Sequence, residues 1–138
     1  MKNIEYLEHT ADIGIVVYGR GIKELYENAA YGMFSLITNL EHIKEEEEIK
    51  IDTEGVDKES LLVNWLNDLL YEFAAVRVIF KKFKINEMTE TNLTATCKGE
   101  KIKPEIHKFN LEIKSATYNM LTIEKKNDIY KATIVFDV

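Results

Sequence analysis

The segment IGIVVYGRGIKELYENAAYGMFSLI, residues 13–37, decides the fold because a strand pattern passes directly into a helix pattern. Its apolar residues alternate up to Gly19, which predicts a strand over residues 13–19. From Ile22 to Ile37 the apolar residues recur at helical spacing, which predicts an amphipathic helix after the glycine at position 21. This strand and this helix are the first two elements of the expected fold.

A second strand and helix follow, and after them the chain carries strand patterns. A short strand over residues 48–53 precedes a helix with Asp57 as its N-cap and an apolar stripe from Leu62 to Phe73. Further strands are expected over residues 78–85, 92–98, 121–125 and 129–138, whereas residues 103–118 show no clear pattern. This order predicts an α+β fold, a mainly antiparallel sheet with two amphipathic helices on one face.

Length and composition set the class of protein. The 138 residues with 46% apolar content are expected to form a single compact domain, residues 1–138. No apolar run approaches the roughly 20 residues of a membrane span, so no membrane partner is expected. The first residues lack the apolar core of a signal peptide. The single cysteine, Cys97, is expected to be buried and fits a reducing compartment, which favours the cytoplasm.

The net charge bears on the kind of partner. With 18 basic and 24 acidic residues the chain carries a net charge of −6. Tight binding to a phosphate backbone draws its affinity from lysine and arginine, so this balance argues against an autonomous nucleic-acid-binding module. Partner proteins are the favoured class.

Two aspartates stand in strand patterns near the two ends of the chain, Asp12 and Asp137. Aspartate is depleted in strands, and a partly buried carboxylate is costly unless it is paired, hydrogen-bonded or bound to a cation. Hard cations such as calcium and magnesium prefer such oxygen ligands, and a free carboxylate at Val138 would add a third anionic group. Hydrogen bonds from backbone or lysine at strand ends are the alternative, and the residues alone leave both open.

Three other residues are candidates for a role in a site. His9 lies three residues before Asp12, where it either reaches the same site or holds the turn. Lys114 is expected to form a surface salt bridge, with a buried carboxylate such as Asp12, a phosphate or a partner as alternatives. His107 lies beside the only proline, in the segment without a clear pattern.

Four segments together carry a resemblance to a known family. They are HTADIG at residues 9–14, LLVNWLNDLL at 61–70, EIKSATY at 112–118 and VFDV at 135–138. In this order, over the whole chain, they resemble the archease family. One departure stands in the third segment, where the family often has histidine after the tyrosine and this chain has Asn119.

The resemblance implies a function that composition alone does not reach. It implies a protein that activates the GTP-dependent tRNA-splicing ligase by promoting its guanylylation and supporting multiple turnover in joining tRNA exon halves. It also implies a chaperone-like cofactor that can broaden the nucleotides the ligase accepts, is not itself an enzyme, and meets tRNA halves only through the ligase.

The resemblance also implies a site. Its metal ligands would be Asp12, Asp137 and Val138, holding a divalent cation, calcium first, with magnesium or manganese as alternatives. His9 and Lys114 fall in the family segments and are further functional candidates. The competing hypothesis is a metal-dependent enzyme that processes phosphates by itself with the same carboxylates. Against it, the sequence has no glycine-rich phosphate loop, paired cysteine motif or His-Glu-x-x-His helix.

Overall fold

Seven strands and two helices make up the part of the chain that the computed structural model describes, residues 4–8 and 12–138. In chain order they are β1 (Ile4–Glu8), β2 (Asp12–Gly19), α1 (Ile22–Ile37), β3 (Glu47–Glu54), α2 (Lys58–Val76), β4 (Val78–Met88), β5 (Asn92–Lys101), β6 (Ser115–Lys126) and β7 (Ile129–Asp137). The two predicted helices and the strand that precedes each are confirmed. The first strand, β1, had no prediction of its own.

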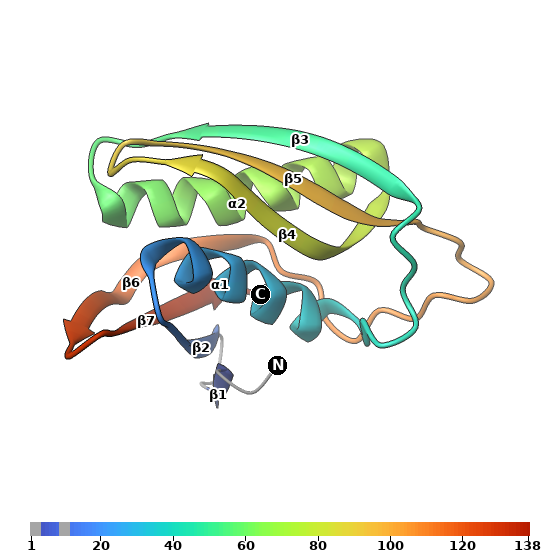
Figure 1. Cartoon of the computed structure of the whole chain (residues 1–138). Helices are drawn as coiled ribbons and strands as arrows, with labels where there is room; N and C mark the ends of the chain where they lie inside the picture. Colours follow the sequence, from blue (N-terminus) through green and yellow to red (C-terminus); the bar gives the residue numbers. More distant parts are fainter. Residues whose placement is uncertain (1–3, 9–11) are drawn as a thin grey trace.

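The strands form two antiparallel sheets with the helices between them (Figure 1). One sheet has the order β1-β2-β7-β6, and the other has the order β3-β5-β4. Helix α1 packs against β2 and β4, and α2 packs against β6 and β3. The predicted α+β class is confirmed, and the structure refines it: the expected single sheet is two, each with the helices on one of its faces.

Local chemistry explains where α2 begins and ends. Asp57 is its N-cap, as predicted: the carboxylate accepts the Ser60 N–H at 2.7 Å, and the Ser60 hydroxyl accepts the Asp57 N–H at 3.2 Å. The helix ends at Arg77, whose φ of 55° lies in the left-handed region. The chain therefore turns sharply and starts β4 at the next residue.

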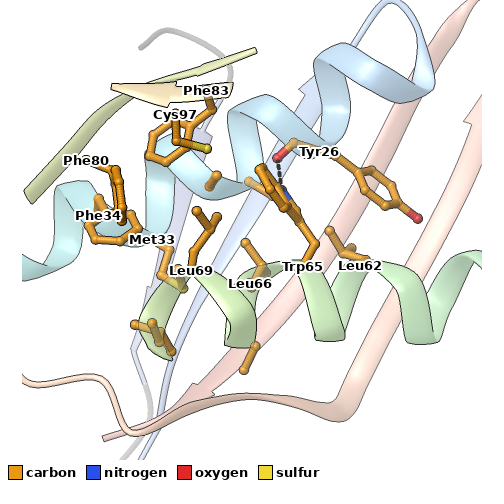
Figure 2. Close-up of a cluster of buried hydrophobic side chains, with 14 of the residues drawn as sticks. Tyr26, Met33, Phe34, Leu62, Trp65, Leu66, Leu69, Phe80, Phe83 and Cys97 are labelled. Atoms are coloured by element: carbon orange, nitrogen blue, oxygen red, sulfur yellow. Dashed lines mark hydrogen bonds between the residues drawn. The ribbon is translucent and has the colours of Figure 1, made fainter. Parts of the chain in front are cut away.

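The core fills the space between the two sheets and is built on the two helices, and Figure 2 shows the part of it around Trp65. Trp65 is fully buried, and its indole N–H donates to the Tyr26 carbonyl oxygen at 2.9 Å. The Phe34 ring meets the Phe80 ring edge-on at 5.7 Å between centroids. Cys97 is buried as expected, and burial raises the pKa of its thiol to about 12. No helix in the described ranges is long and apolar enough to cross a membrane.

The start of the segment without a sequence pattern contacts a buried carboxylate, Glu100. Only 4% of Glu100 is exposed, and its Oε1 accepts the Lys44 N–H at 2.9 Å. Its Oε2 lies 3.7 Å from the Lys103 ammonium and 3.5 Å from His107 Nε2. The backbone hydrogen bond from Lys44 is the main cause that lowers the pKa of this carboxyl. Glu100 therefore connects the end of β5 both to the loop between α1 and β3, through Lys44, and to the segment that follows β5, through Lys103 and His107.

His107 belongs to this anchor. Its Nδ1 accepts the Lys103 N–H at 2.7 Å, so the ring proton of the neutral imidazole sits on Nε2 and faces Glu100. The contacts give His107 a structural role at the start of the irregular segment.

Candidate functional site

The pairing of β2 with β7 sets Asp12 directly opposite Asp137. Residues directly opposite in an antiparallel pair place their side chains on the same face, with Cβ atoms roughly 5 Å apart. On the other side of Asp137, β6 contributes Ser115 in register. A row of three polar residues, Asp12, Asp137 and Ser115, therefore crosses one end of the four-stranded sheet. We call it the carboxylate row.

Alternation along β7 fixes the face on which this row lies. Phe136 is fully buried in the core, whereas Asp137 is exposed and Asp12 is half-buried. Val138 is half-buried and packs against the core. The carboxylate row therefore lies on the sheet face that points away from the helices, where a partner can reach it.

The chemistry of this donor set fits a hard divalent cation. Two carboxylates directly opposite each other repel and destabilise the pairing of their strands, and a cation between them would remove that repulsion. Calcium and magnesium take carboxylate oxygens as ligands. Within residues 4–8 and 12–138, no three His, Cys, Asp or Glu side chains cluster for metal binding. A cation held by Asp12 and Asp137 would need further oxygen ligands from another kind of group.

The other sequence candidates have different outcomes. His9 lies outside the described residues. The Lys114 side chain is exposed, and no ion pair includes it in the described part of the chain, so the expected salt bridge is not found there. The Lys114 backbone N–H instead donates to the Asp137 carbonyl oxygen at 2.8 Å. Lys114 is thus the neighbour of the carboxylate row, with its ammonium group open to solvent.

One residue with a positioning role had no prediction, Asn67 on α2. Its side-chain oxygen accepts the Ala116 N–H at 2.8 Å, and its side-chain nitrogen donates to the Ala116 carbonyl oxygen at 3.2 Å. The Asn67 amide thus makes the two backbone hydrogen bonds that a neighbouring strand would make with Ala116 at this edge of β6, next to Ser115. The available signal was a polar residue within the apolar 61–70 segment. Sequence alone, however, does not say which backbone groups such an amide meets.

Comparisons with known proteins agree over the whole chain. The model of the archease protein family matches residues 4–138. Protein archease of Methanosarcina mazei is 44% identical over 141 residues, which cover 99% of this chain and 97% of the relative. Protein archease of Sulfurisphaera tokodaii is 41% identical, with 100% of both chains covered.

Two solved structures share the fold. The solution structure of Methanobacterium thermoautotrophicum protein 1598 has a TM-score of 0.85 at 35% identity, and the match covers 100% of both chains. The crystal structure of an archease, possible chaperone, from Thermotoga maritima has a TM-score of 0.69 at 24% identity. That match covers 96% of this chain and 94% of the other, and shows likeness of fold alone.

Proposed function

This chain belongs to the archease protein family, and on that premise we propose that it activates the GTP-dependent tRNA-splicing ligase. In this proposal it promotes guanylylation of the ligase, supports multiple turnover in joining tRNA exon halves, and broadens the nucleotides the ligase accepts. The chain is a protein cofactor and not an enzyme, and it meets tRNA halves only through the ligase.

The observation that carries the proposal is the opposition of Asp12 and Asp137 across β2 and β7. Both aspartates fall in segments that resemble the family. We propose that they hold a divalent cation, calcium first and magnesium or manganese as alternatives, together with Val138. The cation supplies a Lewis-acidic positive charge at that end of the sheet. Asn67 keeps the adjacent strand edge in place through its two bonds to Ala116.

Two further residues have a role in the same proposal, Lys114 beside the row and His9, which lies outside the described residues. The Lys114 ammonium, open to solvent among the described residues, is placed to contact an anionic group of the ligase or of its bound nucleotide. His9 precedes Asp12 in the same family segment and is proposed to contact the ligase as well.

Activation without catalysis requires unequal binding of two ligase states. A cofactor with equal affinity for both shifts nothing, whereas a tenfold preference for the nucleotide-accepting state shifts their ratio about tenfold. The Thermotoga maritima relative carries the description possible chaperone, which agrees with a protein that acts on a partner's conformation.

The test is ligase guanylylation with GTP and a divalent cation, plus multiple-turnover RNA joining, with this chain at substoichiometric amounts. We expect stimulation by the wild type and its loss in Asp12→Asn and Asp137→Asn. Asp52→Asn is the matched control, because Asp52 is an exposed strand aspartate opposite Thr94 on the other sheet. Stimulation that survives in both row variants would contradict the proposed site.

The competing hypothesis, a metal-dependent phosphate-processing enzyme, is tested in the same experiment. Turnover of RNA or nucleotides by this chain without the ligase, lost in Asp137→Asn, would replace the cofactor proposal.

A further inference from the structure

A hollow of about 940 Å³ lies between the second half of α2 and the irregular segment that leads into β6. Its lining includes Leu70 and Phe73 from α2 and Leu111 and Ile113 from the segment. Lys114 and Ser115 also line it, so the hollow ends beside the carboxylate row. We call this hollow the α2 groove.

Two aromatic side chains that line the α2 groove are exposed to solvent. Tyr71 is 67% exposed and Phe109 is 45% exposed, and both line the groove. Most of the lining is apolar, and contiguous exposed apolar surface on a small protein marks a place where something binds. An aliphatic and aromatic lining fits apolar side chains better than a phosphate or a sugar.

The irregular segment offers backbone groups to a partner. Burial alternates from Leu111 to Lys114 with strand spacing, half-buried, exposed, buried, exposed. Within the described residues, the N–H groups of positions 111–113 make no backbone hydrogen bond. Pairing resumes at Lys114, whose N–H donates to Asp137. A peptide strand can be recognised by such backbone groups, with alternate side chains in the apolar groove.

The charge of the α2 groove differs in sign from that of the chain. Arg77 and Lys114 line it against a single acid, Glu112, whereas the whole chain carries −6. Neither cation takes part in an ion pair within residues 4–8 and 12–138. These cations would complement carboxylates on a bound segment.

From these three features we propose that the α2 groove binds an extended segment of the partner ligase that carries apolar side chains and at least one carboxylate. The inference rests on the proposed function for the identity of the partner. The bound segment anchors the ligase beside the carboxylate row. RNA fits the groove less well, because its backbone would lie against an apolar lining.

The first test measures affinity of the full chain for the cognate ligase. Tyr71→Ala with Phe109→Ala removes the exposed aromatic surface, and we expect ligase affinity to fall about tenfold or more. We expect Arg77→Glu to weaken binding as well and to reduce its dependence on salt. The affinity for calcium should stay unchanged in these variants, because none of them alters Asp12 or Asp137.

Matched controls separate the α2 groove from the general surface. Val56→Ala removes an apolar side chain that is 85% exposed, near the start of α2 and about 20 Å along the helix from Tyr71. Lys84→Glu reverses an exposed charge on the three-stranded sheet. Both variants should bind the ligase like the wild type. Circular dichroism and thermal unfolding confirm that each variant is folded.

The second test maps the contact directly. A photoreactive p-benzoylphenylalanine replaces Tyr71 in one variant and Val56 in another, and each is irradiated with ligase, GTP and RNA. We expect crosslinks from position 71 to one ligase segment that contains apolar and acidic residues, and none from position 56. Crosslinks from position 71 to RNA, or equal crosslinks from both positions, would overturn the inference.

The outcomes distinguish this inference from the proposed function. The wild type could stimulate the ligase while the variant with Tyr71→Ala and Phe109→Ala binds the ligase as tightly as Val56→Ala does. That result would overturn the proposal for the α2 groove alone. A folded wild type that neither binds nor stimulates the ligase overturns both.

Discussion

The core around Trp65 and the carboxylate row are built by opposite rules. In the core, aromatic and aliphatic side chains are fully buried, and the polar indole N–H has its acceptor. In the carboxylate row, two like charges stand directly opposite each other on adjacent strands. Asp12 on β2 is half-buried, and Asp137 on β7 is exposed. In the core, apolar side chains are buried and the indole N–H is paired, as each residue type favours. In the row, two aspartates stand opposite each other in a sheet, which their like charges disfavour.

Stability and the proposed function therefore depend on different parts of this fold. A packed core has few alternatives, so its residues hold the helices against both sheets. A pair of opposed carboxylates gains nothing for folding by itself, and the cation that we propose there would remove the repulsion between them. Substitutions in the core should therefore change stability, and substitutions in the row should change cation binding and ligase activation.

The largest effect is expected in the core. Trp65→Ala should lower the free energy of unfolding by about 3–5 kcal/mol, because it leaves a cavity and removes the donor to the Tyr26 carbonyl. Urea unfolding followed by circular dichroism measures the change. Tyr71→Ala on the same helix is the control, since Tyr71 is 67% exposed and should change stability by less than about 1 kcal/mol. Equal losses in the two variants would contradict the assignment of the core.

A smaller effect, with a pH dependence, is expected at Glu100. The native state lowers the pKa of this carboxyl from an ordinary value of 4.5. The charged form therefore adds stability above the ordinary pKa, and this contribution is lost as the pH falls through the lowered native value. In urea unfolding, the stability difference between wild type and Glu100→Gln should shrink from about pH 6 to about pH 3. A difference that stays constant over this range would refute the role of the charge.

Asn67 lies on α2, the helix that carries Trp65, and its side chain bonds Ala116 beside the carboxylate row. Its loss should therefore affect both stability and calcium binding. Asn67→Ala should lower the free energy of unfolding by about 1–3 kcal/mol, because two backbone groups of Ala116 lose their partner. It should also weaken calcium binding at the adjacent carboxylate row. Asn64→Ala is the control: Asn64 lies on the same helix and bonds the Glu54 carbonyl at 2.8 Å, away from the row. Calorimetry should show unchanged calcium affinity in Asn64→Ala, and an equal loss in both variants would remove Asn67 from the site.

The smallest effect has the opposite sign. Without divalent cations, Asp12→Asn should raise the free energy of unfolding by about 0.2–1 kcal/mol, because it removes a like charge opposite Asp137. Adding calcium should stabilise the wild type and not the variant, since binding to the native state adds stability by mass action. Thermal unfolding with EDTA and with calcium measures both parts. A variant that calcium stabilises as much as the wild type would place the cation elsewhere.

Local patterns were enough to predict most of the elements. The alternation up to Gly19, the helical stripe after it and the Asp57 cap depend on neighbours in sequence, and each is confirmed. Sheet partners depend on contacts between distant segments, so the division into two sheets had no local signal. Strand β6 begins six residues before its predicted start because an irregularity, with Met120 at a φ of 57°, interrupts the alternation.

The candidate site was predictable in part for the same reason. Asp12 and Asp137 stood out because aspartate is unusual in a strand, and the pairing of β2 with β7 brings them together. Their register, the amide of Asn67 and the burial of Glu100 depend on tertiary contacts. The sequence marked Lys114 as a candidate, and the structure adds that its backbone binds Asp137 while its ammonium is exposed.

Asp12 and Asp137 are proposed to hold one divalent cation together, and the predicted effects at the carboxylate row depend on this cation. The most direct measurement is isothermal titration of calcium into the metal-free full chain, with Asp137→Asn and Asp52→Asn in parallel. We expect a single site in the wild type and in Asp52→Asn, with affinity at least about tenfold weaker in Asp137→Asn. Equal binding by all three proteins, or none by the wild type, would contradict it.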